Sequence, residues 1–116
     1  MEFGKAAHLR RRREFLAVQD RGRRLFAREL VVLAIPNGCG RARLGITVSS
    51  KVANAVVRNR IKRWVREAFR ATAAQLPAVD LVVIARSGAG SVGLDGARAA
   101  LDGARRKLAA GEGGAR

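Results

Sequence analysis

The stretch Lys51–Arg70, KVANAVVRNRIKRWVREAFR, decides how this chain folds. On an α-helix, with about 100° between successive residues, its apolar and charged residues separate onto two faces. The apolar face is typical of a helix that packs on a core, with Trp64 expected at its centre beside Val57, Ile61, Val65, Ala68 and Phe69. The opposite face carries Arg58, Arg60, Lys62, Arg63, Arg66 and Arg70. Like charges this close repel one another, and a bound polyanion would remove that cost.

The charge of this helix is almost unmixed, because Glu67 is its one acid, whereas solvated helices usually mix both signs. Arg58 and Arg60 also fall in the first helical turns, where cations oppose the helix dipole. The whole chain repeats the pattern, with 24 Lys and Arg against 9 Asp and Glu in 116 residues and a net charge of +15. Such an excess indicates a nucleic acid first and an anionic membrane surface second.

Strands are expected on both sides of this helix. Before it, residues 25–35 form an apolar strand, the turn residues 36–40 follow, and residues 43–49 form a strand that returns as a hairpin. Ser50 or Asn54 can cap the helix, whose pattern continues to about Gln75. After it, the continuous apolar run of residues 80–86 predicts a buried strand.

Two further helices are expected, over residues 9–20 and 94–108, and together these elements form an α+β sandwich. The strand–helix–strand unit over residues 43–86 suggests a parallel pair joined by the cationic helix. We expect a flexible basic arm at residues 1–8, a single domain at 9–110 and a disordered tail at 111–116. The chain shows no signal-peptide pattern and no long apolar run, which favours a cytoplasmic location and argues against a membrane partner.

Residues for catalysis are not apparent. The acids are scattered, His8 is the only histidine, and no acidic cluster could hold two Mg²⁺ ions. The glycine-rich run near Gly88 lacks the ending of a phosphate-binding loop and is expected to be a surface turn. Cys39 is the only cysteine and is given no role. We therefore expect no catalytic residue and no metal site in the protein itself.

Phe15 and Val18 on the first helix allow two interpretations. Aromatic and apolar residues of short amphipathic helices usually belong to the core. The alternative is a stacking surface for an unpaired base, worth about 1–3 kcal/mol per base.

The cationic helix resembles the signature helix of the protein subunit of bacterial ribonuclease P. The matching segments are Asn54-Ala55-Val56, Arg58-Asn59-Arg60, Lys62-Arg63, Arg66-Glu67 and Phe69-Arg70. Residues 12–22, 44–49 and 80–86 are also similar to the family's first helix and to the strands on either side of the signature helix. The resemblance thus covers nearly the whole chain.

The resemblance implies a two-layer α+β fold of α-β-β-β-α-β-α order, with a small mixed sheet and a left-handed βαβ crossover as in some ribosomal proteins. It also implies that the chain is an RNA-binding protein cofactor of an endonuclease, and that this endonuclease is a ribonucleoprotein of the hydrolase class. In that enzyme a catalytic RNA removes the 5′ leader from precursor tRNA. The implied partners are the ribonuclease P RNA and the 5′ leader, and Mg²⁺ is expected through the RNA and not on the protein alone.

Two RNA-binding surfaces are implied. The signature-helix surface comprises Lys51, Asn54, Arg58, Asn59, Arg60, Lys62, Arg63, Arg66 and Arg70. The leader cleft, between the first helix and the sheet, comprises Arg12, Arg13, Phe15, Val18 and Leu33. Gln19 and Leu33 stand where the family often has aromatics, Ala53 where it usually has glycine, and Ser50 where it often has a basic residue.

Two other classes of protein fit parts of the pattern. A ribosomal protein or RNA chaperone could use the same sandwich and the same cationic helix with no role in cleavage, and its RNA affinity would not depend on a 5′ leader. A self-sufficient nuclease is disfavoured by the scattered acids and the single histidine.

Overall fold

The computed structural model describes residues 9, 12–27 and 29–109, so the predictions for residues 1–8 and 111–116 lie outside the described part. The elements run in the order α1 (Arg12–Arg21), β1 (Arg23–Ala27), β2 (Leu30–Pro36), β3 (Arg43–Thr47), α2 (Ala55–Thr72), β4 (Val79–Ala85) and α3 (Gly93–Ala109). Short 3₁₀ turns follow α2 at Ala73–Gln75 and precede α3 at Ala89–Ser91. The predicted α-β-β-β-α-β-α order is confirmed.

The four strands form one mixed sheet in the order β1-β2-β4-β3. β3 and β4 are parallel and joined by α2, as predicted, while β1–β2 and β2–β4 are antiparallel. Two expectations were wrong. The single strand expected over residues 25–35 is the tight hairpin of β1 and β2, in which Ala27 pairs with Leu30. β3 does not return beside β2, because β4 lies between them. β4 is apolar on both faces and buried almost throughout, which suits the sheet interior.

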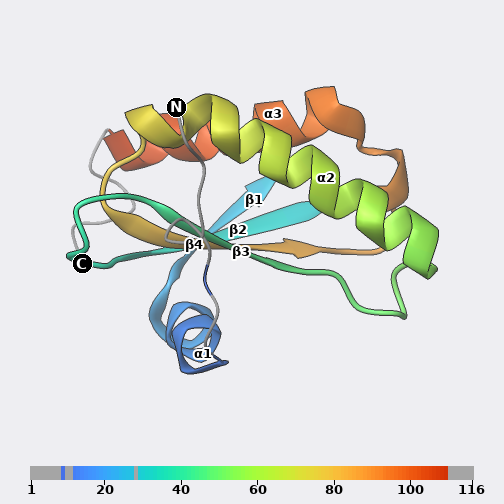
Figure 1. The fold of residues 1–116 in the computed structure, drawn as a ribbon, viewed down its shortest axis with the longest axis horizontal. Coiled ribbons are helices and arrows are strands. Elements are labelled where there is room, and N and C mark those ends of the chain that lie inside the picture. Colours follow the sequence, from blue (N-terminus) through green and yellow to red (C-terminus); the bar gives the residue numbers. More distant parts are fainter. Residues whose placement is uncertain (1–8, 10–11, 28, 110–116) are drawn as a thin grey trace.

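Helices cover both faces of the sheet, and Figure 1 shows α2 and α3 together on one face and α1 alone on the other. The larger core lies under α2 and α3 and includes Val65, Phe69 and Leu101, each fully buried. The smaller core lies under α1 and contains Leu9, Val18, Val31, Leu33 and Val82. Among these described residues, no helix is long and apolar enough to cross a bilayer.

The helix α2 begins at a side-chain cap. Asn54 Oδ1 accepts a hydrogen bond of 2.9 Å from the backbone N–H of Val57, so Asn54 and not Ser50 is the N-cap. The buried face of α2 centres on Val65, with Ile61, Ala68 and Phe69 around it. Trp64 is only partly buried at the border of this face, which corrects the expectation that it lies at the centre.

Candidate RNA interface

The outward face of α2 is a surface of unpaired cations. Arg60, Arg63 and Arg66 are exposed and Lys62 is half-buried. Within the part of the chain that the structure describes, none of these four has an ion pair or a side-chain hydrogen bond. Within that part of the chain, no acidic side chain offsets their mutual repulsion by pairing with them.

The other predicted residues of the signature-helix surface hold the helix as well as facing solvent. The half-buried Arg58 donates a hydrogen bond of 3.2 Å from Nη1 to the carbonyl of Ala53, and Asn54 is the N-cap. Arg70 is exposed, and its Nη1 lies 3.6 Å from Oε2 of Glu67, which makes a weak surface ion pair. Lys51 and Asn59 are exposed. Most of the cations that remain available to a partner therefore lie in the middle of α2, with Lys51 in the loop before the helix.

The ring of Phe15 lies on β3, because Gly45 leaves room for it. A Cβ on Gly45 would fall 2.5 Å from Cε1 of Phe15, a distance that real contacts do not reach. Gly45 is therefore required for α1 to approach the sheet, and a glycine inside a strand is the sequence signal for such an approach. Phe15 is half-buried, with one side packed on the sheet and the rest facing two pockets.

These two pockets connect α1 with α2 across the edge strand β3. The first, of about 420 Å³, is lined by Arg12, Phe15, Leu16, Gln19 and Thr47. The second, of about 160 Å³, is lined by Leu9, Phe15, Leu44, Gly45 and Ile46, together with Lys62 and Arg66 of α2. Phe15 borders both, so the apolar groove beside α1 is continuous with the cationic face of α2.

The structure brings together only part of the predicted leader cleft. Arg12 and Phe15 line the groove, but Arg13 lies along a different stripe of α1 with Ala17 and Asp20. Val18 and Leu33 are 0% and 1% exposed beneath α1, so they belong to the core and not to an open surface. For Val18 the sequence had already offered the core as one of two interpretations, whereas the assignment of Leu33 to the cleft was wrong. Sequence reasoning missed two other lining residues, the exposed Leu16 and the half-buried Thr47.

A partly buried network of ion pairs joins α1 to the sheet beside this groove. Arg43 on β3 donates from Nε and Nη2 to the two carboxylate oxygens of Asp80 on β4, both at 2.8 Å, and from Nη1 to Glu14 of α1 at 3.2 Å. Asn37 also donates to Asp80, at 2.8 Å. The hydrogen bonds that Arg43 donates to Asp80 raise the pKa of the Arg43 guanidinium above its ordinary value, so Arg43 stays charged. Sequence reasoning missed this network, since its partners lie 29 to 43 positions apart and give no local signal.

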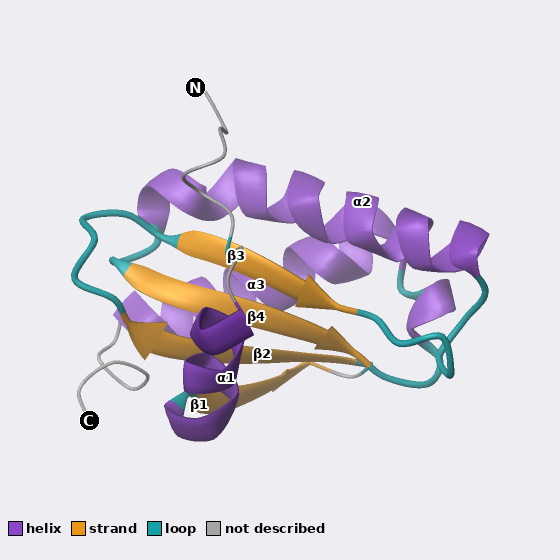
Figure 2. Ribbon diagram, turned by 60° about the horizontal axis from the view of Figure 1, so that its bottom comes forward, coloured by secondary structure: helices purple, strands orange, loops and turns teal. Residues whose placement is uncertain are grey.

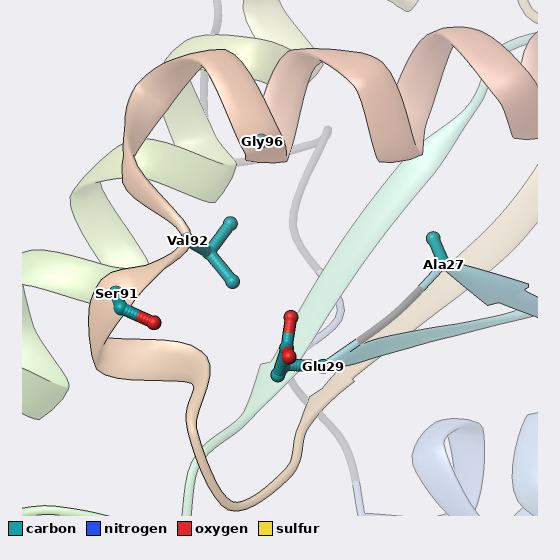
Figure 3. A pocket seen from close by; sticks show the side chains of 5 residues that line it. All are labelled: Ala27, Glu29, Ser91, Val92 and Gly96. Carbon is teal, nitrogen blue, oxygen red and sulfur yellow. The ribbon is translucent and has the colours of Figure 1, made fainter.

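The part of the chain that the structure describes holds no group of three or more His, Cys, Asp or Glu side chains suited to a metal ion. A further small pocket lies between the β1–β2 turn and the start of α3, where Glu29 points toward Val92 and Gly96 (Figure 3). Its volume of about 90 Å³ is far below the roughly 300–1,000 Å³ of a typical small-molecule site.

Fold and surface together define a small basic α+β protein with an uncompensated cationic helix and an adjoining groove. The chain matches the family model described as Ribonuclease P over residues 3–109. The ribonuclease P protein component of Desulfovibrio desulfuricans is 45% identical over 97 residues, covering 81% of this chain and 75% of that protein. That of Thermotoga maritima is 44% identical over 85 residues, covering 72% and 73%.

Solved structures agree with the sequence comparisons. The RNase P protein of Staphylococcus aureus superposes with a TM-score of 0.78 at 34% identity, covering 90% of this chain and 96% of that one. The RNase P protein of Thermotoga maritima superposes with a TM-score of 0.76 at 37% identity, covering 86% and 96%. The chain belongs to the ribonuclease P protein family. Ribonuclease P protein components are parts of an endoribonuclease that processes tRNA.

Proposed function

We propose that this protein binds the ribonuclease P RNA through the cationic face of α2 and holds the 5′ leader of precursor tRNA in the groove beside α1. The observation that carries the proposal is the position of Phe15. It borders one pocket with Arg12 and another with Lys62 and Arg66, so one surface offers both cations and an aromatic ring. Surfaces for unpaired nucleic acid combine these two features.

The chemistry belongs to the RNA in this proposal. In this proposal the RNA subunit binds the Mg²⁺; the described part of the protein holds no group of three or more His, Cys, Asp or Glu side chains that could hold a metal ion. The protein contributes affinity through its positive field, which attracts phosphates and lowers repulsion between the RNA subunit and its substrate. Membership of the family favours this role over that of a ribosomal protein or an RNA chaperone.

The test is a reconstitution with ribonuclease P RNA, comparing affinity for tRNA with a leader of several nucleotides and for mature tRNA. We expect Phe15→Ala to weaken binding of the leader-bearing form by about 1–3 kcal/mol and to leave mature tRNA unaffected. Because Phe15 also packs on Gly45, Phe15→Leu is the matched variant: it keeps apolar volume and should show the same selective loss while remaining folded. Equal losses for both tRNA forms would contradict a leader-binding role.

A further inference from the structure

Two neighbouring residues of α1 contact two positions of β3 that share one face of the sheet. Glu14 accepts a hydrogen bond of 3.2 Å from Nη1 of Arg43, and the ring of Phe15 lies against Gly45. Arg43 and Gly45 are two residues apart on the strand, so both positions face α1, because side chains alternate along a strand. We call the ion pair between Glu14 and Arg43 the α1 tether. It holds the helix one residue away from the ring that borders both pockets.

The Arg43 side chain is itself held in one position. Its Nε and Nη2 each donate at 2.8 Å to the buried Asp80, and Asn37 donates to the same carboxylate at 2.8 Å. Asn37 is fixed in turn, because its Oδ1 accepts a hydrogen bond of 2.7 Å from the backbone N–H of Cys39. A bidentate pair of arginine and carboxylate adds geometric specificity as well as energy. Arg43 therefore offers its Nη1 to α1 from a fixed point on the sheet.

The chain holds the two ends of α1 but does not by itself fix the rotation of the helix about its axis. Before the helix, the backbone N–H of Leu9 donates to the carbonyl of Leu44 on β3 at 2.8 Å. After it, Gly22 alone separates α1 from β1 at the opposite edge of the sheet, and Figure 2 shows α1 crossing the strands. Among the residues of α1, all of which the structure describes, only Val18 is buried, and apolar contact is non-directional. A directional ion pair such as the α1 tether is suited to fix the rotation.

We infer that Arg43 is a positioning residue for leader binding, and that it acts through Glu14 to fix the rotation of α1 and so the place of the Phe15 ring. The inference rests on the proposed function and adds to it the residue that prepares the groove. Without the α1 tether, only a fraction of the molecules would hold the ring beside the cations of α2. The apparent affinity for a leader falls by that fraction.

Charge and positioning predict opposite results when Glu14 is neutralised. Removal of a carboxylate beside a cationic groove should strengthen the binding of any polyanion. If Glu14 places Phe15, Glu14→Gln should instead weaken the binding of leader-bearing tRNA, by roughly 2- to 5-fold for a partly exposed ion pair, and cause no such loss for mature tRNA. Asp102→Asn on α3 is the matched control. It makes the same change of charge, breaks the ion pair with Arg105 and should cause no selective loss.

The test measures the affinity of the holoenzyme, reconstituted with ribonuclease P RNA, for mature tRNA and for precursor tRNA with a leader of several nucleotides. Glu14→Gln should lose affinity for the precursor alone. In a Phe15→Leu background the same change should cause no further loss, since no ring remains to be placed. Arg43→Lys keeps a cation beside Asp80 but lacks the planar fork that reaches both carboxylates, so it should match Glu14→Gln. Melting temperatures, measured in parallel, show that each variant is folded.

Other outcomes separate the inference from the proposed function. If Phe15→Leu loses affinity for the precursor and Glu14→Gln does not, the inference is wrong and the proposed function stands. If the wild type binds both tRNA forms equally, both are wrong. The inference is also overturned if Glu14→Gln causes the same loss with and without the Phe15 ring, or the same loss for both tRNA forms. Glu14 would then act on RNA binding or on stability by another route.

Discussion

Arg43 connects three elements of the fold through one side chain. Asp80, its main partner, is 6% exposed, whereas the Arg43 side chain is 22% exposed. Arg43→Met leaves the buried carboxylate of Asp80 with Asn37 as its side-chain donor among the described residues. We expect the free energy of unfolding to fall by about 2–4 kcal/mol, less than for a fully buried pair because the Arg43 side chain is partly exposed. Urea unfolding of the free protein measures the change in the free energy of unfolding. Because its pKa is raised, Arg43 is charged and stabilises the fold at every pH below the ordinary arginine pKa. The loss of stability in Arg43→Met should therefore not vary between about pH 6 and 9.

A matched control lies on α3, where Arg105 donates to Asp102 at 2.7 Å and lowers the pKa of that carboxyl. Both partners of this pair reach water, so Arg105→Met should cost much less than Arg43→Met. Similar losses for the two variants would mean that the burial of Asp80 has little energetic consequence.

At the scale of elements, α2 divides into a structural face and a cationic face, and mutations should separate them. Arg60→Ala and Arg63→Ala remove exposed, unpaired cations, so each should weaken RNA binding and leave the melting temperature nearly unchanged. In the double variant, the slope of log affinity against log salt should fall by roughly 0.7–0.9 for each lost phosphate contact. Titrations of the protein with ribonuclease P RNA at several salt concentrations measure this slope. An unchanged slope with a lowered melting temperature would identify the two arginines as structural.

The sequence predicted α2 almost completely, because helical periodicity and a capping residue are local signals. The strand order was not predictable in the same way, since nothing local indicates that β4 separates β2 from β3. The β1–β2 hairpin was missed because residues 25–35 read as one apolar run, with Arg28 and Glu29 the only interruption. At the candidate site, Phe15 and the α2 cations were identified from sequence.

At the scale of the whole molecule, a net charge of +15 in 116 residues opposes compaction of the RNA-free protein. We expect its melting temperature to rise with KCl, as the Debye length shortens from about 10 Å at 0.1 M to about 3 Å at 1 M. RNA affinity should fall over the same range, because counterion release contributes less at high salt. Thermal melts and RNA titrations in the same KCl series measure both. The Arg60→Ala/Arg63→Ala variant, with less self-repulsion, should gain less from salt than the wild type. If salt lowered the melting temperature of the free wild-type protein, attractive surface ion pairs would outweigh repulsion, and the cations of α2 would be compensated within the chain.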